Sequence, residues 1–209
     1  MKKKLALLLS FALCLSLLAG CGQQTAGEDA SDLQNEYTPN LLTGEKQAAD
    51  YDAAKRPVAI MINNIYEALP QRGIGDADLI YEMVTEGGIT RLMAVYSDAS
   101  KIPDVGPVRS ARDQHVQMML PLEAIYVHIG SSSYADEMLT HYKYENREID
   151  GKKKDGLLWY DEQRAKTRQP LHCWYTNAKL ISECIEKYQV NTQAVEKRTA
   201  FDFVPYDEA

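Results

Sequence analysis

Val58-Ala59-Ile60-Met61-Ile62 is a continuous apolar run that directly follows Pro57. A short apolar run without polar alternation is typical of a strand that is covered on both faces. We therefore expect residues 58–62 to form a central strand of the sheet. The rest of the domain should supply a covering layer on each side of it.

Residues 79–85 and 91–96 are two more β-like runs, separated by Glu86-Gly87-Gly88-Ile89. The two glycines suit a tight turn, so we expect these runs to pair as a β-hairpin. Residues 125–129 form a further apolar run of the buried type. A hairpin beside buried strands predicts a mixed sheet.

Three segments have helical patterns. In residues 110–120, Ser110 can act as the N-cap, and apolar side chains follow at three-four spacing. Residues 135–142 and 177–188 are the other two predicted helices. Strands that alternate with helices indicate the α/β class, here a mixed sheet with a β-hairpin and helices packed on both faces.

Two segments are harder to place. Residues 144–169 are highly charged, and we expect a surface loop or lid there. The apolar residues 157–160 within this segment should dock back on the body of the domain. Residues 201–204 are expected to begin another strand.

The amino terminus has the pattern of an export signal. Three lysines at positions 2–4 precede an apolar and small-residue run from residue 5 to residue 18. This run is shorter than the roughly 20 apolar residues that a transmembrane helix needs. The next residues, Leu18-Ala19-Gly20-Cys21, resemble the lipobox of bacterial lipoproteins.

The lipobox resemblance implies a signal peptide over residues 1–20, cleavage before Cys21, and a lipid carrying fatty acids such as palmitate on the Cys21 thiol. The alternative is an ordinary secretory signal with an incidental cysteine. The spacing of the lysines, the apolar run and the Leu-Ala-Gly-Cys motif favours the lipobox. Two or three acyl chains would hold the protein stably on its membrane.

The segment after Cys21 differs in composition from the rest. Residues 21–54 are polar and lack a hydrophobic period, so we expect a disordered tether there and a globular domain over residues 55–209. The whole chain has a net charge of -7, and removal of the signal takes three lysines away. This acidic balance argues against broad attraction to nucleic acid or to anionic lipid.

Cys173 and Cys184 are the cysteines left after Cys14 leaves with the signal and Cys21 is acylated. They form no disulfide framework. They could pair, but we favour Cys184 as a core residue of the last helix. The sequence has no zinc spacing, Walker loop, dinucleotide fingerprint or Gly-x-Ser-x-Gly elbow, so we expect no metal and no cofactor.

The stretch with most chemical information is Gly106-Pro107-Val108-Arg109-Ser110-Ala111-Arg112-Asp113. Arg109 and Arg112 lie three residues apart, beside a serine at the expected start of a helix. Guanidinium groups and unpaired N–H groups together suit a phosphate or a carboxylate. The alternative is that both arginines simply pair with Glu82, Glu86 or Asp113, and the sequence leaves the two interpretations open.

Glu82 and Glu86 flank the end of one hairpin strand, and Arg91 opens the next. These three side chains could form a salt-bridge network or an acid/base pair, and we favour the network. His128 ends a predicted strand, where open α/β sheets place their ligands. It is a candidate ligand-binding residue, although a histidine in an apolar strand is more often a hydrogen-bonded core residue.

Several motifs together resemble one family. The chain is similar to the YerB-like bacterial lipoproteins, whose molecular function is unknown, and the resemblance covers most residues after position 55. It also implies a second, carboxy-terminal domain, which we expect this chain to lack. The matching pieces are Pro70-Gln71-Arg72-Gly73-Ile74, Ala77-Asp78-Leu79-Ile80-Tyr81-Glu82, Glu86-Gly87-Gly88-Ile89-Thr90-Arg91, Gly106-Pro107-Val108-Arg109-Ser110-Ala111-Arg112, Tyr126-Val127-His128-Ile129-Gly130, His172, Tyr175 and Thr176.

These observations lead to a first hypothesis, which is a membrane-anchored envelope lipoprotein on the extracytoplasmic face that binds an anionic ligand or a cell-wall component. The expected ligand-binding residues are Arg91, Arg109, Ser110, Arg112 and His128. The arginines at an expected helix start on an exported domain motivate it.

Two alternatives remain open. The first is an envelope-polymer hydrolase or phosphoryl transferase with Glu82 or Glu86 as the base and the arginines holding charge. The second is a protein-binding scaffold for another membrane protein, in which the arginines are structural. We expect no catalytic residue unless the first alternative holds.

Overall fold

The computed structural model describes residues 39–194 and 201–203. The expected signal peptide, Cys21 and the first part of the expected tether lie outside these residues. The described residues belong to one compact unit.

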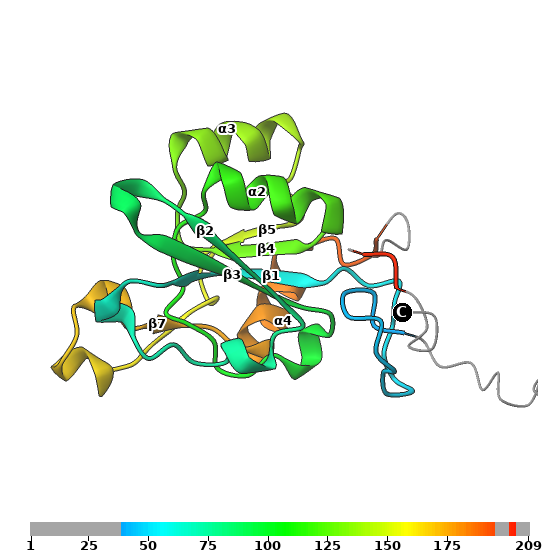
Figure 1. Ribbon diagram of the computed structural model, residues 1–209, viewed down its shortest axis with the longest axis horizontal. Helices are drawn as coiled ribbons and strands as arrows, with labels where there is room; N and C mark the ends of the chain where they lie inside the picture. Colours follow the sequence, from blue (N-terminus) through cyan, green and yellow to red (C-terminus); the bar gives the residue numbers. More distant parts are fainter. Residues whose placement is uncertain (1–38, 195–200, 204–209) are drawn as a thin grey trace, which may run out of the picture. The chain divides into compact units, whose positions relative to one another are not determined.

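A five-stranded sheet forms the centre of the domain, in the order β2-β3-β1-β4-β5 (Figure 1). The central strand β1 (Val58–Asn63) is antiparallel to β3 (Thr90–Tyr96) and parallel to β4 (Ile125–His128). The outer strands are β2 (Leu79–Val84), which forms the hairpin with β3, and β5 (Glu148–Asp150), which is parallel to β4. The predicted central strand, hairpin and mixed sheet are confirmed.

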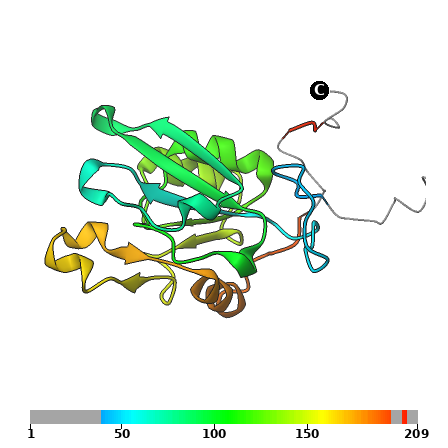
Figure 2. The same cartoon turned by 60° about the horizontal axis from the view of Figure 1, so that its bottom comes forward.

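Helices cover both faces of the sheet. Helices α2 (Asp113–Met119) and α3 (Ser133–His141) lie on one face, and α4 (Ala178–Lys187) lies on the other (Figures 1 and 2). Because side chains of a strand alternate between its faces, β1 divides its residues between two cores. Ala59 and Met61 pack toward α2 and α3. Val58, Ile60 and Ile62 pack toward α4.

The expected loop over residues 144–169 contains more structure than its charge suggested. It carries β5 and also β6 (Trp159–Tyr160), which pairs with β7 (Trp174–Tyr175) in a small second sheet. Leu157 is buried in the α4-side core, so the expected docking of residues 157–160 is confirmed for this residue. Short 3-10 turns complete the described elements: Tyr66–Ala68, Ile74–Asp76, Glu86–Gly88, Ala99–Lys101, Leu120–Leu122, Arg164–Lys166 and Pro170–His172.

Strand β5 was missed because it is only three residues long and two of them are acidic. Its backbone pairs with β4, and that pairing comes from the tertiary fold rather than from a local pattern. The strand expected from residue 201 is absent from the described residues 201–203. Cys173 and Cys184 are both buried and unpaired, and Cys184 lies in the α4-side core as expected.

The first helix begins later than predicted, and Ser110 is not its N-cap. The helix starts at Asp113, and Arg112 occupies the N-cap position without a capping side-chain hydrogen bond. Val108 forms a bridge with Ile62, and Ala111 forms one with Ser131. The backbone around Ser110 is therefore extended between two strands and is not available for a helical turn.

The ordered body also begins earlier than predicted, so the boundary at residue 54 is wrong for residues 39–54. Leu42 is 4% exposed and packs in the core under α2 and α3. The buried Asn40 donates from Nδ2 to Asp78 Oδ1 at 2.6 Å. Single residues in this polar segment find partners far along the chain, which composition cannot reveal.

Candidate functional site

The Gly-Pro-Val-Arg-Ser-Ala-Arg motif lies where the parallel strands β1 and β4 end. These strands pair only at their first three residues, and the motif fills the gap between their carboxyl ends. Arg109 N donates to Met61 O at 2.9 Å, and Ile129 N donates to Arg109 O at 3.1 Å. Hydrogen bonds to both strands therefore fix the backbone on which Arg109 stands.

Three arginines gather at this edge, and we call Arg91, Arg109 and Arg112 the arginine cluster. Arg91 is the second residue of β3, is 3% exposed, and donates from Nη1 to Ser110 O at 2.6 Å. Burial, followed by the charges of Arg112 and Arg109, lowers the pKa of Arg91 to about 10. Burial and then the charge of Arg112 also lower the pKa of Arg109. The positive charges are thus close enough to repel one another.

The arginine cluster has few counter-charges. Arg112 Nε lies 2.5 Å from Glu86 Oε1, and its Nη1 donates to Ala111 O at 2.7 Å. Among residues 39–194, no carboxylate lies within ion-pair distance of Arg109 or Arg91. The Nε of Arg109 is buried without a hydrogen bond. The cluster therefore holds three guanidinium groups against one carboxylate.

The predicted salt-bridge network of Glu82, Glu86 and Arg91 is wrong for Glu82. Glu82 lies opposite Leu92 in the hairpin, so it shares a sheet face with Leu92 and not with Arg91. Its Oε1 accepts from Thr90 Oγ1 at 2.6 Å and from Asn64 Nδ2 at 3.0 Å. Glu86 alone reaches the cluster, and it does so through Arg112. The alternative that Arg109 and Arg112 both pair with acidic residues therefore holds for Arg112 only.

His128 ends β4 as predicted, but its side chain is fully buried. Its Nδ1 lies 2.9 Å from Gly130 O, and its Nε2 lies 3.0 Å from Glu148 Oε1. Asp150 completes the group by accepting from Gly130 N at 2.6 Å. These contacts match the alternative of a hydrogen-bonded core histidine, and in this arrangement the ring does not reach a surface ligand.

The same buried group could in principle hold a metal ion, because His128, Glu148 and Asp150 offer ligand atoms within 4.8 Å of one another. However, Lys153 Nζ lies 3.6 Å from Glu148 and 3.7 Å from Asp150, and supplies positive charge itself. Burial raises the pKa of Glu148, but His128 and Lys153 more than offset it, so the pKa is lowered. The group works as an internal charge network.

Three polar residues that were not predicted as site residues lie near the arginine cluster. The buried hydroxyl of Tyr126 lies beside the backbone of Arg112 and within the electrostatic reach of Arg91 and Arg112. Asn63 Nδ2 lies 2.9 Å from His172 Nδ1. Asn63 could have been noticed as the polar residue that ends an apolar run. Tyr126 and His172 stand in the family-like motifs, but they were not singled out as site residues.

Two buried histidines predict how stability depends on pH. Burial is the main cause that lowers the pKa of His115 and of His172, and the charge of Arg109 lowers that of His172 further. Both rings are neutral in the fold, while the unfolded chain takes up protons near the ordinary pKa of 6.5. The contribution of these two histidines to the free energy of unfolding is therefore fully present above pH 6.5. It is lost as the pH falls toward their lower pKa values in the folded state.

Urea denaturation at a series of pH values checks this expectation. Each unit of pKa difference contributes about 1.4 kcal/mol. A His115→Gln variant should show a shallower loss of stability with acid, whereas the exposed His141→Gln control should keep the parental slope. Stability that stays constant or rises on acidification below 6.5 would contradict the assignment.

None of the helices within residues 39–194 combines the length and the apolar character that crossing a bilayer requires.

Comparison with known proteins identifies relatives of this chain. A relative from Bacillus subtilis (strain 168), named "Putative lipoprotein YerB", is 34% identical over 179 residues, which is 84% of this chain and 50% of that protein. The crystal structure of YerB protein from Bacillus subtilis matches with a TM-score of 0.64 and 33% identity, over 75% of this chain and 51% of that chain. The chain spans about half the length of these relatives.

The family profile described as the N-terminal domain of a protein of unknown function (DUF3048) matches residues 42–191. This range begins within the segment that was expected to be tether, in agreement with the burial of Leu42. The resemblance to YerB-like proteins is confirmed, and the chain belongs to the DUF3048 N-terminal domain family.

Proposed function

We propose that the chain is a membrane-anchored envelope lipoprotein whose α/β domain binds an anionic ligand or cell-wall component through the arginine cluster. Arg109 and Arg112 would contact the ligand, and the buried Arg91 would hold Ser110 and the loop in place. Phosphate and carboxylate groups match guanidinium donors in geometry and in charge.

The observation that carries the proposal is the unmatched charge of Arg109. Its guanidinium is partly buried beside two other arginines, and no described carboxylate pairs with it. Burying a charge without a partner is unfavourable. A bound anion would remove both the repulsion and the missing hydrogen bonds. Ser110 is half-buried in the same loop and contributes its backbone carbonyl to Arg91.

Titration calorimetry of the purified full-length protein with inorganic phosphate and with a phosphorylated cell-wall fragment tests this proposal. We expect saturable binding that Arg109→Gln weakens roughly tenfold or more, because a charge-assisted hydrogen bond contributes about 1.5–3 kcal/mol. The matched control is Lys179→Gln, which removes one exposed positive charge on α4. Absence of binding by the folded parent, or equal losses in both variants, would overturn it.

The anchoring is proposed from the lipobox-like motif and from the lipoprotein name of the relative. Acyl chains on Cys21 would hold the domain at the extracytoplasmic face of the cell membrane. When cells that express Cys21→Ser are fractionated, the variant should be unprocessed and should carry no lipid. A Cys21→Ser protein that is processed and membrane-bound like the parent would remove this part of the proposal.

The enzymatic alternative has less support in this arrangement. Glu86 is engaged by Arg112, and Glu82 is engaged by Thr90 and Asn64. A general base must lie beside the substrate proton in a site that positions the substrate. Both carboxylates also lie on the exposed rim of the hairpin and not in a closed cleft.

A further inference from the structure

A cavity of about 310 Å³ lies at one end of the central strands, and the arginine cluster lies at the other end. This is the edge where the parallel strands β1 and β4 begin and where β3 ends. Its volume is near the lower limit of small-molecule pockets, which limits the occupant to a small ligand. The cavity is lined by Asp50, Tyr51, Asp52, Lys55, Arg56, Ser97, Asp98, Ala99, Ser100, Ile125, Ala178, Ser182, Ile185 and Thr192.

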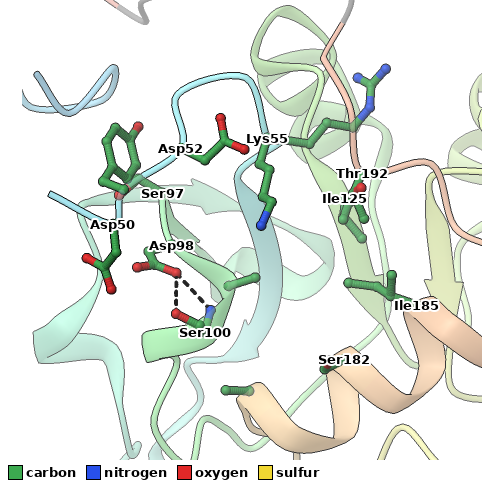
Figure 3. Close-up of a pocket in the computed structure, with 14 residues that line it drawn as sticks. Asp50, Asp52, Lys55, Ser97, Asp98, Ser100, Ile125, Ser182, Ile185 and Thr192 are labelled. Atoms are coloured by element: carbon green, nitrogen blue, oxygen red, sulfur yellow. Dashed lines mark hydrogen bonds between the residues drawn. The ribbon is translucent and has the colours of Figure 1, made fainter. Parts of the chain in front are cut away.

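The ammonium group of Lys55 points into this space (Figure 3). No carboxylate of the described residues lies within ion-pair distance of it. The neighbouring Arg56 does not offer a second free cation, because its Nη1 lies 3.3 Å from Glu123 Oε2. The cavity thus presents one free positive charge, which suits a carboxylate.

Negative charge also lines the cavity, from Asp52 beside Lys55 and from Asp50 across the space from it (Figure 3). Asp52 accepts a hydrogen bond from Ala54 N at 2.9 Å and has no ion pair within the described chain. Asp50 is 77% exposed at its side chain, and its contact with Lys101 is long, at 3.9 Å. Asp98 is less available, because it pairs with Lys101 at 3.0 Å and accepts from Ser100. Asp50 and Asp52 therefore suit a ligand ammonium group.

The remaining wall is small and partly apolar. Ile125 and Ile185 face the space from β4 and α4, and the hydroxyls of Ser182 and Thr192 lie beside them (Figure 3). Such a surface accommodates a methyl-sized side chain and offers hydrogen bonds to a peptide group. A bulky ligand would meet the helix on one side and the loop of residues 97–100 on the other.

From this arrangement we infer that the cavity binds a small zwitterion, namely an amino acid or a short peptide with small apolar side chains. Its carboxylate contacts Lys55, its ammonium contacts Asp50 and Asp52, and its side chain rests on Ile125 and Ile185. This site is separate from the arginine cluster, so the inference goes beyond the proposed function and does not depend on it.

Titration of the purified full-length protein with alanyl-alanine tests the inference, alongside two blocked forms of the same dipeptide. N-acetyl-alanyl-alanine lacks the ammonium, and alanyl-alanine amide lacks the carboxylate. We expect saturable binding of the free dipeptide and roughly tenfold weaker binding of each blocked form, since each loses a charge-assisted contact.

Lys55→Met is the informative variant, because it keeps the length of an exposed side chain and removes its charge. This variant should bind the free dipeptide roughly tenfold more weakly than the parent does. Its affinity for the amide should equal that of the parent, because the amide has no carboxylate for Lys55 to bind. Ser182→Trp on the exposed side of α4 should block the cavity, and Lys179→Met on the same helix is the matched control.

Two results would overturn the inference. One is the absence of saturable binding of the free dipeptide to the folded parent. The other is a Lys55→Met variant that binds the free dipeptide as tightly as the parent. Arg109→Gln should bind the free dipeptide as tightly as the parent does, which distinguishes this cavity from the arginine cluster.

Discussion

Replacing Arg56 with alanine is expected to lower the free energy of unfolding by about 3–5 kcal/mol, because it breaks a buried ion pair on one side only. The Arg56 side chain is 1% exposed and that of Glu123 is 13% exposed. Arg56 Nη1 also donates to Glu123 O at 2.8 Å, which ties the start of β1 to the turn before β4. Burial lowers the pKa of Arg56, and the charge of Glu123 works against this.

Urea denaturation monitored by fluorescence measures this loss. Glu123→Gln should cost less than Arg56→Ala, because the backbone carbonyl that Arg56 contacts remains. Arg168→Ala serves as the control at an exposed arginine, and it should change stability by about 0.5 kcal/mol or less. An Arg56→Ala protein as stable as the Arg168→Ala protein would show that the pair contributes little.

Gly106→Ala is expected to cost about 3 kcal/mol and to weaken anion binding at the same time. Gly106 has a φ of +154°, and a Cβ there would lie 2.8 Å from Tyr175 Cδ1 and 2.9 Å from Trp174 O. The backbone cannot move aside easily, because Arg72 N donates to Gly106 O at 2.9 Å. Any shift would be passed to Arg109, three residues later in the same extended segment.

Gly87→Ala is the matched control for backbone conformation. Gly87 has a φ of +72°, but no atom lies within 4 Å of a Cβ built there. This variant should therefore cost about 1 kcal/mol, which is the strain of a left-handed alanine without a clash. Thermal unfolding and phosphate titration of both variants separate the cost of backbone strain from the cost of the steric clash. Equal losses of stability would mean that the contacts around Gly106 are not limiting.

Local sequence patterns predicted the central strand and the hairpin, but they did not predict the contacts of Glu82 or the strand β5. The apolar run at residues 58–62 and the hairpin around Gly87 were predicted because they depend on hydrophobic burial and turn chemistry within a few residues. Glu82 was misplaced, because the register of the hairpin decides which face a side chain takes, and one residue changes that face. Strand β5 was missed because its pairing with β4 is non-local.

The arginine cluster illustrates the same division. Arg109 and Arg112 were recognised from their spacing, yet the helix start that was expected to accompany them lies beyond Ser110. Whether each arginine has a counter-charge depends on Glu86 from the hairpin turn, and the burial of Arg91 depends on the strands around it. The cavity at Lys55 had no signal in the sequence at all, because its walls come from five separate segments.

The sequence by itself determined the family, the α/β class, the central strand and the residues of the Gly-Pro-Val-Arg-Ser-Ala-Arg motif, since these depend on local composition and spacing. Only the tertiary structure decided that His128 is enclosed beside Glu148, and that none of the acidic residues it describes pairs with Arg109. The physical reason is that electrostatic energies depend on distance and burial, and both are set by residues far apart in the chain.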